Sequence, residues 1–396
     1  MGKNPNEVTM IVGKRFDKRG NILNAVGISG WTEIRITRGV ERLPNDFEIG
    51  LTELYPNEIN TVSIAPGDAC QVLIGDDVVV TGYVDRVVPS IDSVSHGIRV
   101  SGRGRCQDLV DCSAVWPGGQ LVGNAASIAQ NLCSVFGIEV KCSVPSSVIP
   151  QFNLMQGETS WEVIERMSRY DALLAYELPD GNLCLTRNSA IDFNATASAG
   201  HLVEVPTIPT AASGFEIGVN VQSASVEYGM DQRYSDYTAY LQALAPLTEA
   251  GDAGNLLATV RDEGCSRYRP HAIIAEATSG SQDVAARRAL WERNRRIGRS
   301  TRVSLTTDGW RDSSGDLYQP NTLVHLKLPQ LKLQECDWVI GEITYHRGDR
   351  GTTADMVIMH PDSYSPEPVQ IQPVLVDGNA IKPQDLYLAK GIPKGA

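Results

Sequence analysis

The chain has 396 residues, more than one ordinary domain holds, so we expect about two to four domains. Its 21% charged and 42% apolar residues are typical of a globular protein with a well-filled core. The net charge of −12 argues against a nucleic-acid-binding surface as the main function, because such surfaces are usually basic. No apolar run approaches the roughly 18 residues of a membrane span, and the first residues lack the pattern of a secretory signal peptide.

The eight cysteines are scattered along the chain and form no Cys-x-x-Cys pair. No histidine stands at ligand spacing from two of them, so a structural zinc site is not expected. Several lie in apolar surroundings, such as Cys133 and Cys184, where cysteine behaves as a small hydrophobic residue. We therefore expect eight free thiols, as in a protein made in a reducing cytosol.

Residues 1–103 are predicted to form a first small antiparallel β-barrel. Ile34 and Ile36 alternate with polar residues, which is the pattern of a half-buried strand. A hairpin is expected with its turn at Gly75–Asp77, and another strand begins near His96. Five or six short strands in about 90 residues suit a small barrel.

Residues 104–205 are predicted to be an α+β domain. Asn124 can cap a helix that stops at Gly137, and Thr159 with Glu162 forms a capping box for a second helix. The polar run at 179–182 is expected to turn a hairpin.

Residues 206–360 are predicted to form a second β-barrel with a helical insertion near 282–298. Its final strands, expected at 323–328, 338–345 and 353–359, weakly repeat the first barrel. In outline, residues 66–74 resemble 320–328, and residues 80–85 resemble 339–344. Two copies of one barrel explain this repeat economically, and chance similarity between hairpins is the alternative. Residues 361–396 are rich in proline and are predicted to be an extended tail.

The sequence offers no local catalytic, cofactor or metal motif. Gly102–Gly104 is too short for a dinucleotide-binding fingerprint, and there is no phosphate-binding Walker sequence. Asp108 and Asp111 are expected to hydrogen-bond backbone at a corner, where Leu109 and Val110 enter a core. The six histidines are far apart in the sequence and match no hydrolase motif. We therefore predict no enzyme activity, no cofactor and no metal.

The helix near 282–298 has the highest density of charge in the chain. Its arginines could form a solvated face, a salt-bridged contact between subunits, or, less readily, a phosphate contact. An acidic protein offers many carboxylates to such arginines. The interface candidates are Arg287, Arg288, Arg295 and the flanking Trp291.

Several short motifs resemble the baseplate hub protein of Mu-type contractile phage tails. They begin at Gly30-Trp-Thr, Thr37-Arg38 and Glu41 and continue at Thr81-Gly-Tyr-Val-Asp85. The segment from Gly102-Arg103 through Asp108-Leu-Val-Asp111 to Gly118-Gly-Gln120 carries the resemblance further. It ends with Arg267-Tyr-Arg-Pro270, Asp308-Gly-Trp310 and Pro320-Asn321. These motifs keep one order from about residue 30 to about residue 360, so the resemblance covers most of the chain.

The resemblance implies a β-rich α+β fold in which two small antiparallel β-barrels and intervening α+β domains assemble as a ring-like trimer. A related architecture occurs in the hub portion of type VI secretion spike proteins. The implied function is a symmetry adaptor in the phage tail, joining a sixfold tail tube to a threefold spike. The implied partners are two further copies of the chain, the tail tube or distal tail protein, the central spike and other baseplate proteins. DNA would pass the central channel without specific binding.

The implied location is the virion, after assembly in the bacterial cytoplasm. A tail-associated cell-wall glycan hydrolase and a glycan-binding module are the alternatives.

If the thiols are free, titration of the denatured, non-reduced protein with a thiol reagent should find all eight. Two or more missing thiols would contradict the prediction, and a reduced sample gives the reference count.

Overall fold

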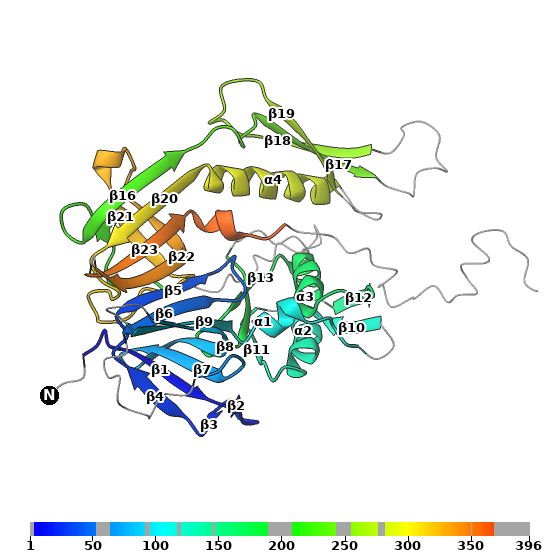
Figure 1. Ribbon diagram of the computed structural model, residues 1–396. Helices are drawn as coiled ribbons and strands as arrows, with labels where there is room; N and C mark the ends of the chain where they lie inside the picture. Colours follow the sequence, from blue (N-terminus) through cyan, green and yellow to red (C-terminus); the bar gives the residue numbers. More distant parts are fainter. Residues whose placement is uncertain are drawn as a thin grey trace, which may run out of the picture.

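The computed structural model describes residues 4–52, 64–91, 96–116, 120–144, 146, 148–188, 208–242, 255–275, 282–349 and 351–367. Strands dominate this part of the chain (Figure 1). No helix within the described ranges is long and apolar enough to cross a membrane. All eight cysteines are free thiols.

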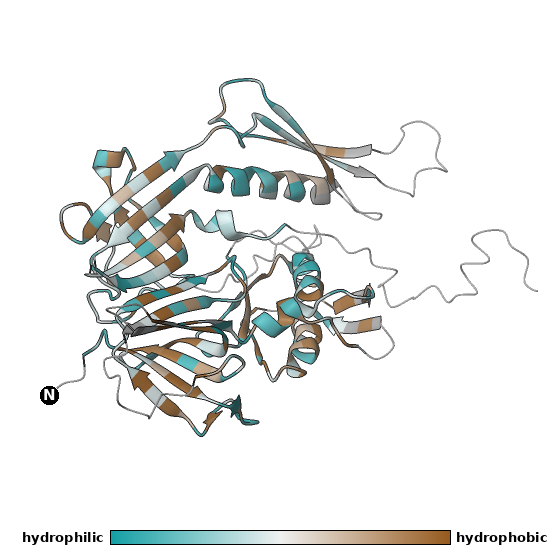
Figure 2. Cartoon of the chain, in the orientation of Figure 1, coloured by the Kyte–Doolittle hydropathy of each residue, from teal (hydrophilic) through white to brown (hydrophobic). Residues whose placement is uncertain are grey.

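The largest element is a sheet of thirteen strands, counted over the described residues. Apolar residues alternate with polar ones along these strands (Figure 2), so each strand turns one face toward the core. Its first seven strands are β1 (Val8–Gly13), β4 (Val26–Ser29), β5 (Glu33–Gly39), β6 (Asp46–Thr52), β7 (Ala69–Ile74), β8 (Asp77–Ile91) and β9 (His96–Gly104). The other six are β15 (Phe215–Glu216), β16 (Val221–Tyr228), β20 (Thr301–Thr307), β21 (Leu323–Lys327), β22 (Cys336–Gly348) and β23 (Gly351–Met359). Strands β2 (Arg15–Phe16) and β3 (Ile22–Leu23) form a separate small hairpin.

Two groups of five strands in this sheet have the same order. The first group runs β5-β6-β9-β8-β7, and the second runs β16-β20-β23-β22-β21. Each copy contains a matching hairpin, β7–β8 in the first and β21–β22 in the second. A residue of positive φ precedes each hairpin, Gly67 at 88° and Asn321 at 59°. The same two backbone hydrogen bonds occur in each copy. In the first, Gly67 N–H donates to the Val84 carbonyl and Val84 N–H donates to the Asp68 carbonyl. In the second, Asn321 N–H donates to the Ile340 carbonyl and Ile340 N–H donates to the Thr322 carbonyl.

The internal repeat is therefore present in three dimensions, with one correction to its alignment. By their hydrogen bonds, Val84 of the first copy is equivalent to Ile340 of the second. The next residue in each strand, Asp85 or Gly341, lies at a break in the strand register, so these two residues are also equivalent. The sequence comparison had instead set Gly82 against Gly341, three residues out of step. Strand order and hydrogen bonding decide the alignment where side-chain similarity is weak.

The two copies do not form two separate barrels. Strand β22 of the second copy pairs antiparallel with β5 of the first, from Glu342 opposite Gly39 to Arg347 opposite Ile34. Neither copy closes on itself through a ladder of described residues. One hydrophobic core runs through both copies. The two predicted small barrels are therefore not seen as closed barrels among the described residues, because the edge of one copy supplies the neighbouring strand of the other.

The predicted helix caps of the middle region are present. Asn124 caps α2 and Thr159 caps α3, each through a reciprocal capping box. The predicted hairpin is formed by β13 and β14, and β11 pairs parallel with β14. The elements are α1 (Gln107–Asp111), β10 (Gln120–Asn124), α2 (Ala125–Ser134), β11 (Val140–Cys142), β12 (Val148–Asn153), α3 (Ser160–Ser168), the 3-10 turn Arg169–Asp171, β13 (Leu174–Glu177) and β14 (Leu183–Thr186).

A second small sheet covers the long helix α4 (Gln282–Arg299) at the top of Figure 1. It is formed by β17 (Asp236–Gln242), β18 (Asn255–Arg261) and β19 (Pro270–Ala275). Ala285 and Ala289 of α4 pack on Tyr237, Ala239 and Ile273 of this sheet. Small residues on this face of the helix allow close packing, while the rest of α4 is largely hydrophilic (Figure 2).

The segment after β23 is not extended, contrary to the prediction for a tail from residue 361. It begins with the 3-10 turn η4 (Pro361–Tyr364), and Ser363, Tyr364 and Ser365 are buried. Residues up to 367 therefore belong to the folded body, and the rest of the predicted tail lies outside the described residues. The domain boundaries at 103, 205 and 360 stay a prediction.

A buried glutamate holds the corner where β9 leads into α1. Glu177, at the end of β13, accepts the backbone N–H groups of Asn45 and Cys106, both at 2.8 Å. A Cβ on Gly104 would lie 2.0 Å from its carboxylate, so only glycine fits there. Burial raises the pKa of Glu177 to about 7, although the two backbone donors act in the opposite direction.

The predicted roles of the two corner aspartates change accordingly. Asp111 does not cap backbone, because its carboxylate receives the guanidinium of Arg103 at 2.8 Å. Burial raises the pKa of Asp108, and the nearby Asp111 raises it further. Leu109 is fully buried as expected, while Val110 is only half-buried.

The raised pKa of Glu177 predicts a pH dependence of stability. The folded protein holds this proton up to about pH 7, whereas the unfolded chain releases it near its ordinary pKa of 4.5. The contribution is therefore complete below about pH 4.5 and is lost as the pH rises through about 7, a change of roughly 3 kcal/mol. Urea unfolding of Glu177→Gln across this range should show a flatter dependence than the wild type. The control is Glu165→Gln, at an exposed ion pair, and an unchanged slope in Glu177→Gln would contradict the assignment.

Candidate functional site

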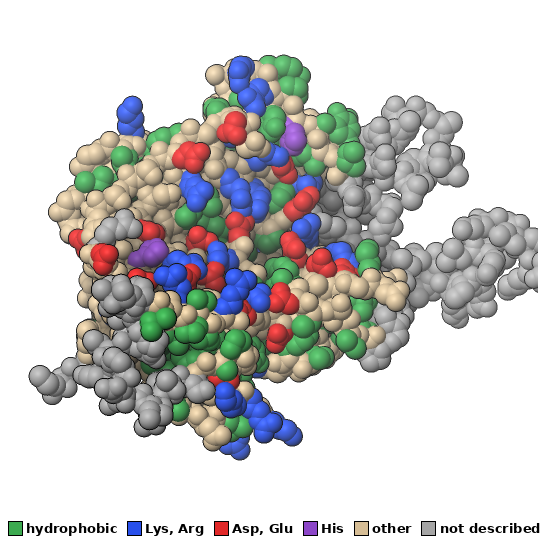
Figure 3. Space-filling view, viewed as in Figure 1, with side chains coloured by type: hydrophobic (Ala, Val, Ile, Leu, Met, Phe, Trp, Pro, Cys, Tyr) green, Lys and Arg blue, Asp and Glu red, His purple; other side chains and the backbone are tan. Residues whose placement is uncertain are grey.

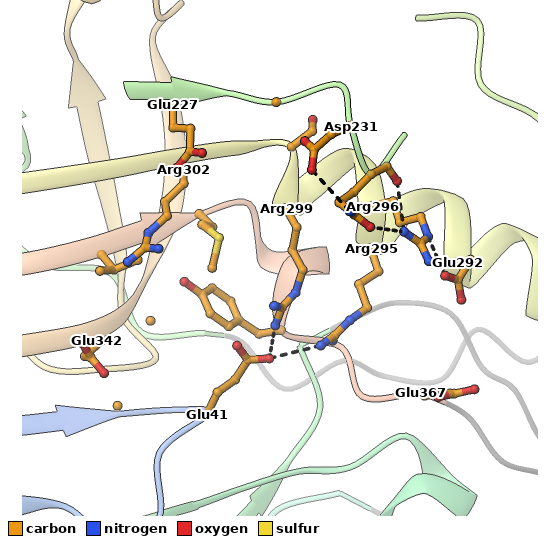
Figure 4. Close-up of a pocket in the computed structure, with 18 of the residues that line it drawn as sticks. Glu41, Glu227, Asp231, Glu292, Arg295, Arg296, Arg299, Arg302, Glu342 and Glu367 are labelled. Atoms are coloured by element: carbon orange, nitrogen blue, oxygen red, sulfur yellow. Dashed lines mark hydrogen bonds and ion pairs between the residues drawn. The ribbon is translucent and has the colours of Figure 1, made fainter. Parts of the chain in front are cut away.

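A charged cleft of about 700 Å³ lies between α4, the corner after β5 and the second copy of the strand repeat. Figure 3 shows basic and acidic side chains interleaved in the band below α4, and Figure 4 shows the cleft itself. Its charged lining residues are Glu41, Arg42, Glu227, Asp231, Glu292, Arg295, Arg296, Arg299, Arg302, Glu342 and Glu367.

Glu41 joins the first strand copy to α4. It follows β5 directly, and its Oε1 accepts Arg295 Nη2 at 3.3 Å and also an Nη of Arg299 (Figure 4). The two arginines are four residues apart and so project from the same side of the helix. Burial lowers the pKa of Arg295, and the neighbouring Arg299 lowers it further. The carboxylate of Glu41 therefore offsets the repulsion between two close cations.

Glu292 organises the next turn of α4. Arg288 lies 2.9 Å from one of its oxygens and Arg296 lies 2.6 Å from the other, both with helical i,i+4 spacing. Burial alone would raise the pKa of Glu292, but these two guanidinium groups outweigh it and lower the pKa. His271 stacks on Tyr234, and burial lowers its pKa, with a further contribution from Arg296. The imidazole of His271 is therefore held toward its neutral form.

Trp291 is buried between two arginines of its own helix. The guanidinium carbons of Arg288 and Arg295 lie 4.6 and 5.6 Å from its ring. Its Nε1 donates to Ser365 Oγ at 3.2 Å. Arg295 also donates to the Ser365 carbonyl, and Arg288 also pairs with Glu367. These contacts bind the segment after η4 along the length of α4.

The structure thus brings together Arg288, Arg295 and Trp291, three of the four predicted interface residues. It places all three in contacts within one chain, so the solvated-face interpretation does not describe them. Arg287 lies on α4, but its side chain is outside the described residues. A role for these residues between subunits stays a prediction.

Sequence reasoning did not identify Glu41 and Glu367 as the carboxylates that hold the arginines in place. Glu41 was named only as part of the family resemblance, and Glu367 belongs to no motif. Glu41 lies 254 residues from Arg295 and Glu367 lies 79 residues from Arg288, so the excess of carboxylates in an acidic chain was the only signal for these pairings.

The described charged groups of the cleft mainly connect parts of this chain to one another. Its charged groups are largely engaged with one another across α4, the β5 corner and the segment at 363–367. The described residues hold no group of three or more side chains suited to a metal ion. Asp111 lies outside the cleft and forms an ion pair with Arg103.

Among the strand edges of the main sheet that have no partner in the described residues, two lie at matching places of the strand repeat. Residues 86–91 of β8 pair with β9 on one side, but β7 ends opposite Tyr83 on the other side. Val88 and Ile91 in this open half are 54% and 80% exposed. The second open edge is β16, the last strand of the sheet, which pairs only with β20 in the described structure. Unpaired edges of this kind are templates for another strand.

The burial of Trp291 predicts a graded loss of stability on substitution. Trp291→Phe loses the hydrogen bond to Ser365 and should cost about 1 kcal/mol. Trp291→Ala also leaves a cavity and should cost about 3–5 kcal/mol, measured by denaturant unfolding. Trp116→Ala, at a half-buried tryptophan of the middle region, is the matched control. A cost below about 1 kcal/mol for Trp291→Ala would contradict the packing described.

Three protein-family models match successive parts of the chain. Residues 23–104 match the N-terminal domain of Mu phage baseplate assembly protein GpP-like proteins. Residues 106–187 match the second domain of baseplate hub protein gp44-like proteins. Residues 281–367 match the fourth domain of Mu phage baseplate assembly protein GpP.

Individual relatives extend the match across most of the chain. The chain is 29% identical to baseplate hub protein gp44 of Escherichia phage Mu over 343 residues, covering 84% of this chain and 85% of that protein. It is similar to the 43 kDa tail protein of prophage MuSo2 from Shewanella oneidensis, with 30% identity and a TM-score of 0.73. That match covers 90% of this chain and 99% of the other. A tail protein from Neisseria meningitidis MC58 shares the fold at 17% identity and a TM-score of 0.65, covering 92% and 99% of the two chains.

These matches confirm the family that the motifs had suggested. They lend no support to the alternative of a tail-associated glycan hydrolase. The domain matches follow one another in chain order, and the identity of 30% extends over nearly the whole length of the prophage protein. The chain belongs to the baseplate hub family of Mu-like phages.

Proposed function

We propose that three copies of this chain form the ring of a phage baseplate hub, which adapts a sixfold tail tube to a threefold spike. Each chain carries two strand groups of the same order, so three chains present six similar units. A ring with closed rotational symmetry repeats one contact and then stops, which suits a finished hub.

One observation carries this proposal: a strand edge that is paired between the two copies has an equivalent in the repeat that is unpaired in the described residues. Residues 342–347 of β22 are covered by β5 of the other strand copy. By the repeat, the matching half of β8 is residues 86–91, and the strand that matches β5 is β16. Neither of these edges has a partner strand within the described ranges of the single chain. Repeating the β22–β5 contact between chains would place β16 of one subunit against β8 of the next.

The repeat also predicts the register of that contact. In the first copy, Ile36 lies opposite Phe47, Phe47 opposite Gly102, and Gly102 opposite Val84. In the second copy, Val226 lies opposite Val303, Val303 opposite Ile358, and Ile358 opposite Ile340. Ile36 therefore matches Val226, as Val84 matches Ile340. Since Arg35 lies opposite His346, Ser225 of one subunit should lie opposite Ser90 of its neighbour.

The remaining partners follow from the family. The tail tube or distal tail protein would contact one face of the ring, and the central spike and other baseplate proteins would contact the opposite side. Three chains of −12 each give a net charge of −36. A ring with this charge would let DNA pass without the counterion release that holds DNA on basic surfaces. The hub would reside in the virion after assembly in the bacterial cytoplasm.

The mass of the purified chain in solution tests the trimer directly. A compact particle of three times 43.0 kDa is expected. Paired cysteines test the contact itself. Ser90→Cys combined with Ser225→Cys should form disulfides between subunits on mild oxidation, giving covalent dimers and trimers under denaturing conditions.

The control shifts one partner by a single residue. Ser90→Cys with Ala224→Cys places the two thiols on opposite faces of the shared sheet, so far less cross-linking is expected. A monomer at all concentrations, or equal cross-linking of both pairs, would refute the proposed contact.

The predicted interface role of the α4 arginines is tested separately. Arg287→Glu should weaken assembly at low salt by about tenfold, and the effect should shrink as salt rises, because exposed charge pairs are screened. Arg288 and Arg295 hold contacts within the chain, so their reversal must be compared with unfolding stability. Unchanged assembly in Arg287→Glu would remove this residue from the interface.

A further inference from the structure

A second cavity, of about 360 Å³, lies where three parts of the chain meet. Arg38 comes from β5 and Tyr176 from β13. The remaining walls are the segment at 209–211, Leu178 and the loop at 312–322 of the second strand copy. The cavity shares no lining residue with the charged cleft below α4.

Arg38 is an unusual buried cation. Only 3% of it is exposed, and it forms no ion pair with the described part of the chain. Its Nε is buried without a hydrogen-bond partner. The guanidinium lies beside the Tyr345 hydroxyl, which itself donates to the Tyr318 carbonyl. Burial raises the pKa of the nearby Glu177 and Arg38 partly offsets this, yet no carboxylate of the described residues lies within ion-pair distance of the guanidinium. A buried charge without a direct ion pair is costly, so the folded protein gains if an anion reaches it.

The nearest carboxylates of the chain are committed elsewhere. Glu177 accepts two backbone N–H groups at the corner of β9 and α1. Asp312 accepts the backbone N–H of Ala212 at 2.8 Å and that of Ser314 at 2.9 Å. Asp316 is exposed and accepts the Ser314 hydroxyl. None of the three lies within ion-pair distance of Arg38 in the described structure.

The wall that faces the α+β region is polar and neutral. Asn321 donates to the Tyr176 hydroxyl at 3.3 Å, and Asn188 donates to Asn321 at 2.8 Å. Asn188 does not itself line the cavity, and its Oδ1 is buried without a partner. Two aspartates on the far wall would repel a multiply charged group such as phosphate. One negative charge suits the single cation best.

We propose that this cavity receives one carboxylate group, which Arg38 binds through the fork of its guanidinium. The planar guanidinium matches a carboxylate with two parallel hydrogen bonds. The carboxylate could belong to a free organic acid or to an acidic side chain of a partner protein. The proposal does not depend on the trimer, because all its residues come from one chain.

Thermal unfolding of the full chain tests the proposal with defined probes. Propionate, which carries one carboxylate, should raise the unfolding temperature in a saturable manner at constant ionic strength, since a ligand that binds only the folded state stabilises it. Sodium chloride is the reference, and acetate, a smaller monocarboxylate, should act in the same way. N-acetyl-glutamate methylamide and the glutamine analogue distinguish a side-chain source: only the glutamate compound should act.

Substitutions assign the effect to Arg38. Arg38→Met should abolish the response, and without ligand it should be at least as stable as the wild type, because it removes an unpaired buried charge. Arg38→Lys should bind propionate at least tenfold more weakly, since it keeps the charge and loses the fork. Arg35→Met is the matched control on the same strand, at a half-exposed ion pair, and should respond as the wild type does.

Three outcomes would overturn the proposal. One is a wild type that shows no saturable response to either carboxylate probe. Another is an Arg38→Met protein that responds as the wild type does. The third is an Arg38→Met protein that fails to fold, because this would show that the fold already depends on a partner of the guanidinium.

Discussion

The pairing of β5 with β22 is the contact on which the rest of the structure depends. It joins residues about 300 positions apart, and the Thr37 and Thr344 hydroxyls meet across it at 3.2 Å. It turns two strand groups into one sheet with one core. It also brings Glu41, just beyond β5, to α4, and it brings Arg38 to the loop at 312–322. Both the charged cleft and the second cavity therefore depend on the pairing of β5 with β22.

Arginine is the residue that fastens the distant segments around this ladder. Arg311 of the second strand copy donates to the backbone carbonyls of Pro5 and Ile74 at 2.8 and 2.9 Å, and pairs with Asp77 at 2.7 Å. Arg299 donates to the Ser363 carbonyl at 3.0 Å while it also reaches Glu41. The five donors of a guanidinium can serve a carbonyl and a carboxylate together, which an ammonium group does less well. An acidic chain can therefore still use its arginines as internal connectors.

The duplicated strand group links this architecture to assembly. One junction between copies is made inside the chain, and the matching edges at β8 and β16 are left over. An open edge with exposed apolar residues such as Ile91 favours aggregation of an isolated protein, whereas in a subunit it can pair with a neighbouring chain. The family to which the chain belongs consists of assembly components, and this gives the leftover edges a reason to exist.

The sequence by itself determined the features that depend on neighbouring residues. The turn at Gly75, the capping boxes at Asn124 and Thr159 and the helix near 282–298 follow from local hydrogen bonding and periodicity, and the structure confirms them. Only the tertiary structure decided that β22 pairs with β5 and that Glu41 receives Arg295 and Arg299. It also decided that Glu177, rather than Asp108 or Asp111, accepts the backbone at the corner. These partners are separated by 71 to 313 residues, and no local pattern encodes a contact that chain folding alone brings together.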